Sequence, residues 1–154
     1  MSYRVQRYDA FSGMGPAEKT ALVNFLHKNS EEKDINIIKD AIDYALKNKP
    51  SFGGIIFMCW EDRRPIGAVL LNNTGMGEYS PKHLLVYAYQ DPEFHKEPQI
   101  LVGLISKAIQ DCKGEIAMHL KPGNPTLSVF QSLGFQEQYV ELRFNDQIPV
   151  ASMG

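Results

Sequence analysis

Residues 54–71 of the chain read GIIFMCWEDRRPIGAVLL. The runs 54–60 and 66–71 are rich in apolar and β-forming side chains, whereas residues 61–65 between them are polar and end on a proline. Two apolar runs joined by so short a polar link are typical of an antiparallel hairpin. We therefore expect two paired strands that turn at Glu61–Pro65.

The residues before this hairpin predict one strand and two helices. Tyr3–Tyr8 alternates weakly and predicts a first strand. A helix is expected to begin at Gly15-Pro16, because the missing N–H of proline would be unpaired in a first helical turn anyway. Asp34 is a candidate N-cap for a second helix that ends near Lys49-Pro50. The apolar stripes of the two helices are Ala21, Leu22, Phe25 and Leu26, and then Ile38, Ala41, Ile42, Ala45 and Leu46.

Strands and helices alternate after the hairpin. A loop rich in asparagine and glycine covers Asn72–Ser80, and Leu84–Tyr89 predicts the next strand. Apolar residues at helical spacing then predict a long helix from about Pro98 to Asp111. A further strand is expected at Glu115–Leu120.

The last part of the chain predicts one more helix and one or two strands. Asn124-Pro125 combines an N-cap with a proline at the first helical position, so a helix is expected from there to Gly134. Gly134 suits the left-handed residue that follows a helix end. Phe135–Phe144 predicts a strand, and residues 146–154 are expected to form a short last strand at Ile148–Ala151 or a flexible tail.

The order of these elements predicts an α/β fold. The strands at 84–89 and 115–120 are separated by one helix, so they should run parallel with a right-handed crossover. The hairpin ahead of them is antiparallel. A mixed, mostly antiparallel sheet with helices on both faces follows. No change in composition divides the chain, so we expect a single domain over residues 1–154.

Composition excludes several classes of function. The 154 residues are 44% apolar and 22% charged with a formal net charge of −2, so the chain lacks the positive surplus typical of nucleic-acid binding. No apolar run approaches the ~20 residues of a membrane helix. His27, His83 and His95 show no metal-ligand spacing, and Cys59 lies in an apolar run as a reduced thiol would. We expect a cytoplasmic protein with no membrane, nucleic-acid or metal partner.

Three motifs in order resemble one family. Glu61–Leu70 reads EDRRPIGAVL and resembles the "E-D-G-x-P-V-G-F-x-x" hairpin of the GNAT N-acetyltransferases. Tyr89–His95 reads YQDPEFH and is similar to the family's "Y-V-H-P-E-Y-R" at the end of its fourth strand. Asn124–Phe135 reads NPTLSVFQSLGF and resembles "N-x-x-A-x-x-x-Y-x-x-x-G-F", although the asparagine of that pattern falls one residue earlier, at Gly123, when it is counted back from Gly134-Phe135. Together these matches run in order from residue 61 to residue 135.

The resemblance implies a fold and a co-substrate. It implies that the parallel strand pair splays apart and that acetyl-CoA lies in the wedge, with its pantetheine along the fourth strand and its diphosphate at the start of the next helix. Unpaired N–H groups at a helix N-terminus bind anions, which gives this arrangement its physical reason. The residues that then fall at the cofactor are Tyr89, Gln90, Asp91, His95, Lys96, Pro98, Gln99, Ile100, Leu101, Asn124 and Phe130.

The sequence departs from the family at several of these positions. Pro98 and Ile100 replace the two expected loop glycines, and Pro98 removes an N–H donor. Phe130 stands where the family has a tyrosine that protonates the leaving thiolate, and Val86 stands where a carboxylate base is frequent. Lys96 and His95 are side-chain cations that partly compensate for the lost backbone contacts.

Two residues are candidate replacements for the lost catalytic groups. Tyr89 at the splay is a candidate proton donor, although a tyrosine there is also explained as part of the core. His119 on the predicted fifth strand has a side-chain pKa suited to a base, although a partly exposed histidine without a role is the simpler explanation.

The resemblance leaves two functions open. The first is an acetyl-CoA-dependent N-acetyltransferase that acts on a small-molecule or protein amine. The second is a catalytically impaired module of the same fold that binds a ligand or partner in a regulatory role. A homodimer is compatible with either.

Overall fold

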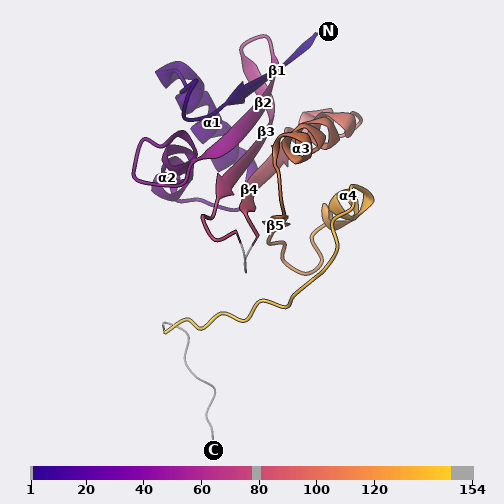
Figure 1. Ribbon diagram of the computed structural model, residues 1–154. Coiled ribbons are helices and arrows are strands. Elements are labelled where there is room, and N and C mark those ends of the chain that lie inside the picture. Colours follow the sequence, from indigo (N-terminus) through magenta and orange to yellow (C-terminus); the bar gives the residue numbers. More distant parts are fainter. Residues whose placement is uncertain (1, 78–80, 147–154) are drawn as a thin grey trace, which may run out of the picture. The chain divides into compact units, whose positions relative to one another are not determined.

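The computed structural model describes residues 2–77 and 81–146 of the chain. These residues form two compact units, Met1–Asn124 and Pro125–Gly154, which are considered one at a time. The first unit contains the whole sheet and three of the helices, and it is shown in Figure 1. The predicted last strand at Ile148–Ala151 lies outside the described residues, and the prediction of one domain stays a prediction.

The sheet of the first unit has five strands that neighbour one another in sequence order. The first four are antiparallel, and the fourth and fifth run parallel, as predicted. The quoted hairpin is the centre of this sheet, with its strands paired from Gly54–Asn72 to Glu61–Arg64. The strands are β1 (Tyr3–Tyr8), β2 (Gly54–Glu61), β3 (Arg64–Asn73), β4 (His83–Gln90) and β5 (Ile116–Met118).

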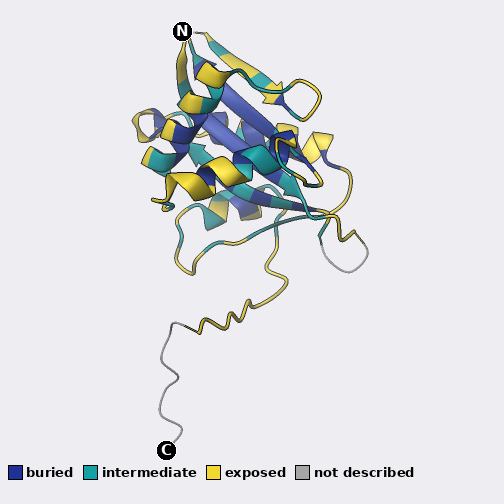
Figure 2. Ribbon diagram, turned by 90° about the vertical axis from the view of Figure 1, so that its left-hand side faces the viewer, coloured by how far each residue is buried: buried dark blue, intermediate teal, exposed yellow. Residues whose placement is uncertain are grey.

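Helices cover both faces of the sheet, which confirms the predicted layers. Helices α1 (Pro16–Asn29) and α2 (Ile35–Leu46) lie on one face, and α3 (Gln99–Asp111) lies on the other (Figure 1). The buried residues lie mainly along the central strands and on the helix sides that meet them (Figure 2). The buried residues of α3 are Ile100, Leu101, Leu104, Ile105 and Ala108.

The helix starts follow from local chemistry. Helix α1 begins at Pro16, and the side chain of Glu18 accepts a hydrogen bond from the N–H of Gly15 at 3.2 Å. Helix α2 begins after Asp34, whose carboxylate accepts the N–H of Asn36 at 2.9 Å. Both starts were predicted, and each satisfies a donor that would otherwise lack a partner.

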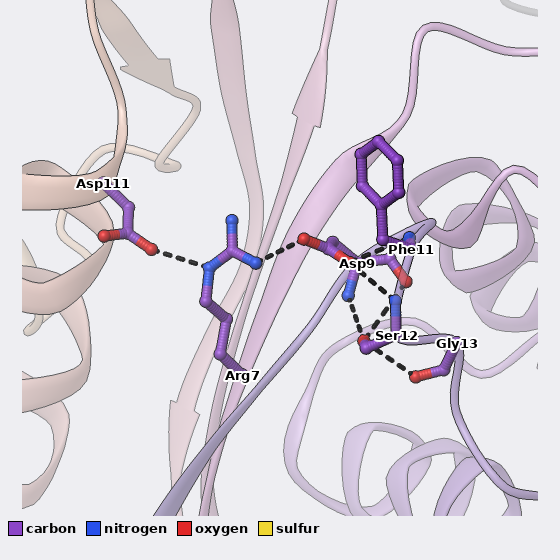
Figure 3. Close-up of polar contacts among 6 residues, drawn as sticks. All are labelled: Arg7, Asp9, Phe11, Ser12, Gly13 and Asp111. Atoms are coloured by element: carbon purple, nitrogen blue, oxygen red, sulfur yellow. Dashed lines mark hydrogen bonds and ion pairs between the residues drawn. The ribbon is translucent and has the colours of Figure 1, made fainter.

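Polar contacts attach the outer strand β1 to α3 (Figure 3). Arg7 Nε donates to Asp111 Oδ2 at 2.7 Å, and the same guanidinium contacts Asp9. Asp9 in turn accepts the N–H groups of Phe11 and Ser12, both at 2.9 Å, and so closes the turn that follows β1. The end of α3 is therefore fixed to the sheet by an ion pair as well as by apolar packing.

Three predictions for the last third of the chain need correction. Strand β5 covers Ile116–Met118 and not 115–120. Helix α4 covers Leu127–Ser132 with Thr126 at its N-cap, so it begins later than Asn124-Pro125. The predicted strand at 135–144 is wrong, because none of these residues pairs with a strand of the described chain. Gly134 does adopt the predicted left-handed conformation, with φ of 102°.

Candidate active site

The parallel strand pair opens partway along β4. Strand β5 pairs with His83–Leu85 and ends at Met118, whereas β4 continues to Gln90. On that side of Val86–Gln90, the described part of the first unit has no further strand. Main-chain groups of β4 are therefore left at an open edge, as the splayed pair inferred from the resemblance requires.

The direction of these main-chain groups follows from one hydrogen bond. The N–H of Asp91 points toward β3, where it donates to the carbonyl of Ile66 at 2.9 Å. Successive residues of a strand direct their main-chain groups to opposite sides. The N–H and C=O groups of Ala88 and Gln90 therefore point to the open edge.

The side chain of Gln90 joins the end of β4 to the start of α3. Its amide nitrogen donates to the carbonyls of Phe94 at 2.7 Å and Glu97 at 3.1 Å. Its amide oxygen accepts the N–H of Leu101 at 3.0 Å. Because Leu101 lies in the first turn of α3, this bond uses a donor that a helix N-terminus ordinarily offers to an anion.

The other N–H groups of this first turn are also limited. Pro98 has none, and the N–H of Ile100 donates to the carbonyl of Glu97 at 3.2 Å. Among residues 98–101, the N–H of Gln99 is therefore the main-chain donor that remains for a ligand. The side chains of Ile100 and Leu101 are buried, so these two residues offer only main-chain groups to a ligand.

The remaining loop residues lie on the surface between β4 and α3. His95 and Lys96 are exposed, and His95 Nδ1 lies 3.1 Å from the carbonyl of Pro92. The carboxylate of Glu97 accepts a hydrogen bond from Tyr3 at 2.8 Å. This bond, with some burial, raises the pKa of Tyr3 to about 12. The loop therefore carries a fixed carboxylate beside the exposed side chains of His95 and Lys96.

Asp91 is a buried carboxylate at the end of β4. It accepts the N–H of Glu93 at 2.9 Å and a guanidinium N–H of Arg64 at 2.8 Å. Burial alone would raise the pKa of Asp91, but these two bonds outweigh it and hold that pKa below its ordinary value. Arg64 and Asp91 border an open cleft of about 310 Å³ along α1.

Two tyrosines lie beside the open edge on the face covered by α1 and α2. The rings of Tyr87 and Tyr89 are 6.4 Å apart, and both residues pack with the core of that face. Burial raises the pKa of Tyr89, and the charge of Glu31 adds to this effect; burial and the charge of Glu32 do the same for Tyr87. Both hydroxyls therefore keep their protons at neutral pH.

His119 lies one residue beyond β5 and is exposed, so it is not on the strand where it was predicted. Nearby in sequence, Lys121 Nζ forms an exposed ion pair with Glu31 at 3.2 Å. This pair places the chain after β5 next to the connection between α1 and α2. Asn124 ends the first unit, and its N–H donates to the carbonyl of Lys121 at 3.1 Å.

Phe130 belongs to the second unit. It is buried in α4, and its ring meets that of Phe135 edge-on with 5.5 Å between ring centroids. A tyrosine hydroxyl is absent from this position, as the sequence shows.

Sequence reasoning placed the main chain of Tyr89–Asp91 at the cofactor and missed the contact of the Gln90 side chain with α3. Of these three residues only Gln90 directs its main-chain groups to the open edge, because those of Tyr89 and Asp91 face β3. A glutamine at a strand end is ordinary, and nothing in its neighbours indicates that it reaches 11 residues onward to a helix start. It also missed Glu31, because an acidic residue between two helices is most simply a solvated one.

Across the described residues, no group of three or more histidine, cysteine or acidic side chains is arranged to hold a metal ion. The described helices include none that is long and apolar enough to cross a membrane.

No family model and no curated protein sequence matches the chain. Solved structures do. The aminoglycoside N-acetyltransferase AAC(6')-Iy in complex with CoA is 15% identical, with a TM-score of 0.69 over 96% of each chain. The same enzyme with a CoA bisubstrate analogue has a TM-score of 0.71 at 15% identity, over 95% of this chain and 99% of that one.

A third structure, the aminoglycoside 6'-N-acetyltransferase AAC(6')-IG from Acinetobacter haemolyticus, is 19% identical with a TM-score of 0.67. The two structures align over 95% of this chain and 99% of the acetyltransferase chain. Similarity at this level of identity establishes the architecture. The chain has the fold of the GNAT N-acetyltransferases.

Proposed function

We propose that the protein is an acetyl-CoA-dependent N-acetyltransferase that acts on a small-molecule or protein amine. The observation that carries this proposal is the open edge of β4 over Val86–Gln90, in a fold whose solved examples include CoA complexes. The fold alone would be weaker support, because one fold hosts many functions.

The pantetheine arm of acetyl-CoA fits this edge chemically. Pantetheine carries two amide groups in an extended chain, and the outward N–H and C=O groups of Ala88 and Gln90 can pair with them as a peptide strand pairs with a sheet edge. Main-chain recognition of this kind requires no particular side chain. It therefore survives the side-chain departures noted in the sequence.

The nucleotide of acetyl-CoA fits the start of α3 less well than the pantetheine arm fits the β4 edge. The N–H of Leu101 is bonded to Gln90, the N–H of Ile100 is bonded to Glu97, and Pro98 has none. Exposed Lys96 and His95 remain as counter-charges for phosphate. They are side chains in solvent, so their contribution is screened by salt.

The acceptor amine is expected near Tyr89, Glu31 and Glu32. The carboxylates of Glu31 and Glu32 are close enough to raise the pKa values of Tyr89 and Tyr87, respectively, beyond the effect of burial. Glu31 is already paired with Lys121 at 3.2 Å, so Glu32 supplies most of the negative charge that favours a cationic substrate here. The acceptor must lose a proton before its nitrogen attacks the thioester carbonyl, and His119 is the candidate base for that proton.

Tyr89 is the candidate acid for the second half of the reaction. When the C–S bond of the tetrahedral intermediate breaks, the thiolate needs a proton, and the hydroxyl of Tyr89 carries one at neutral pH. Burial and the charge of Glu31 raise the pKa of Tyr89, which makes it a weaker donor than an exposed tyrosine. General acid help of this kind is worth ~10²–10⁴-fold in rate. Orientation of the amine against the thioester supplies the rest without any particular side chain.

A second candidate function is a ligand-binding module that has lost catalysis. The closed first turn of α3 favours it, as does the phenylalanine at position 130. Such a module would use the same β4 edge to hold its ligand. Turnover of acetyl-CoA separates the two candidates.

The test combines binding with turnover. Calorimetry with CoA should show binding to the wild type, and a hundredfold excess over Kd should raise stability by about 2.7 kcal/mol. Ala88→Pro removes the outward N–H at this edge without removing a bond to β3, and it should weaken CoA binding at least tenfold. Ala88→Ser keeps that N–H and is the matched control. Binding with acetyl-CoA consumption supports the enzyme, binding without consumption supports the module, and no binding refutes both.

A further inference from the structure

The side chain of Gln90 stands where the first turn of α3 would otherwise meet a phosphate. Its oxygen is 3.0 Å from the Leu101 nitrogen, and its nitrogen is held at 2.7 and 3.1 Å by the carbonyls of Phe94 and Glu97. Each of its amide atoms thus has a partner within the chain. A side chain whose amide nitrogen and amide oxygen are both hydrogen-bonded is not freely displaced, because its partners would be left without a hydrogen bond.

The helix start itself is held in place. Ile100 and Leu101 are 6% and 8% exposed, and Ile100 packs over Gly67 of β3. A shift of the main chain away from Gln90 would pull these side chains out of the core. The Gln90–Leu101 contact is therefore set by packing on one side and by hydrogen bonds on the other.

The surrounding charges offer a diphosphate little attraction. Asp91 and Glu93 are both paired with Arg64, at 2.8 and 2.7 Å, so Glu97 and Lys96 remain as opposite charges in residues 91–101, with His95 beside them. Glu97 directly precedes Pro98, and its carboxylate is held by a hydrogen bond of 2.8 Å from the Tyr3 hydroxyl. An anion placed at this helix start would meet negative charge and few main-chain donors.

We propose that Gln90 makes this site recognise an acyl donor by its pantetheine arm and not by its nucleotide. This inference rests on the proposed acetyltransferase function. The donor class it names is acyl-pantetheine thioesters, of which acetyl-CoA is one member. S-acetylpantetheine, which lacks the nucleotide, should then serve nearly as well as acetyl-CoA.

The balance of the reaction is unchanged by this choice of donor. The acceptor nitrogen forms a bond to the acetyl carbonyl carbon and loses a proton, and the carbon–sulfur bond breaks. The sulfur leaves as pantetheine thiol after it takes up a proton. The nucleotide takes no part in these bonds, so only binding distinguishes the two donors.

The first measurement uses the wild-type chain alone. Calorimetry with CoA and with pantetheine, neither of which reacts, gives the ratio of their Kd values. We expect CoA to bind at most about tenfold tighter than pantetheine, and the kcat/KM values of the two acetyl thioesters should differ by a similar factor. A preference for CoA above a hundredfold would overturn the inference while leaving the proposed function intact.

The second measurement removes the amide of Gln90. Gln90→Met keeps the length of the side chain but frees the N–H of Leu101, and one charge-assisted bond to phosphate should tighten CoA about tenfold. The readout is the ratio of the pantetheine and CoA Kd values, because any general loosening of the β4 edge weakens both ligands alike. Gln110→Met, at an exposed glutamine near the other end of α3, is the matched control and should change neither Kd.

The outcomes separate the two proposals. If neither CoA nor pantetheine binds, both the function and this inference fail. If both bind to the wild type and the CoA preference does not rise in Gln90→Met, the role of Gln90 is wrong and the function stands. Should Gln90→Met fail to fold, the wild-type ratio of Kd values decides the inference by itself.

Discussion

Replacement of Gly67 tests how tightly α3 is seated on the sheet. Gly67 lies in β3, and a Cβ atom added there would be 2.9 Å from Leu104 Cδ1 and 3.1 Å from Ile100 Cγ2. The first distance is shorter than Cβ contacts in proteins and the second is unusually tight, so the side chains of Leu104 and Ile100 must shift or α3 must move with them. Overpacking of this kind costs about 1–3 kcal/mol. For a chain of this length, each 1 kcal/mol lowers Tm by about 2–4 °C.

The assay is denaturant unfolding of Gly67→Ala beside a glycine-to-alanine change with the opposite expectation. Gly103 is exposed on α3, and no heavy atom lies within 4 Å of a Cβ added there. Gly103→Ala should therefore raise stability by roughly 0.5–1 kcal/mol, because alanine is the better helix former. Because Ile100 is in the first turn, Gly67→Ala should also shift the NMR signal of the Leu101 N–H. A Gly67→Ala chain as stable as the wild type would refute the close seating of α3.

Three further changes test other contacts. Asp91→Asn should cost about 1–2 kcal/mol at pH 7, since it weakens the bonds from Arg64 and the main chain. The pKa of Asp91 is lowered in the fold, so this difference should be fully present above the ordinary aspartate pKa of about 4 and be lost progressively as the pH falls from there through the lower pKa of the folded state; unfolding measured in steps from neutral to acidic pH follows it. Tyr44→Phe removes the 2.7 Å hydrogen bond to the Asn73 carbonyl and should lower the free energy of unfolding by about 1 kcal/mol in the same assay. Unchanged stability would show that this hydrogen bond contributes nothing. Phe130→Tyr adds a hydroxyl to a ring that is 2% exposed and packed on Phe135, so it should cost about 1–3 kcal/mol in the same assay; unchanged stability would contradict the burial of this ring.

The first two thirds of the chain were predictable because local signals agree with tertiary packing there. The alternation in Tyr3–Tyr8, the N-cap at Asp34 and the hairpin turn at Glu61–Pro65 each act within a few residues. The parallel pairing of β4 with β5 followed from the intervening helix, since crossover geometry is nearly fixed.

The last third was harder for physical reasons. The apolar alternation of 135–144 is that of a strand, but a strand forms only where a neighbour supplies hydrogen bonds, and a pattern does not reveal the neighbour. Asn124-Pro125 has the composition of a helix start, yet Thr126 caps α4. Gln90 escaped notice because its role depends on a contact between a strand end and the next helix, which residue spacing alone does not specify.

The central claim is that the open edge of β4 holds the acyl donor. The most direct measurement follows the main-chain N–H signals of the isotope-labelled protein by NMR while acetyl-CoA is added. The account predicts that the signals of Ala88 and Gln90 shift most and saturate, while the Leu101 N–H, which stays bonded to Gln90, shifts little. Saturation with no shift at Ala88 or Gln90, or with shifts confined to surfaces away from β4, would contradict it.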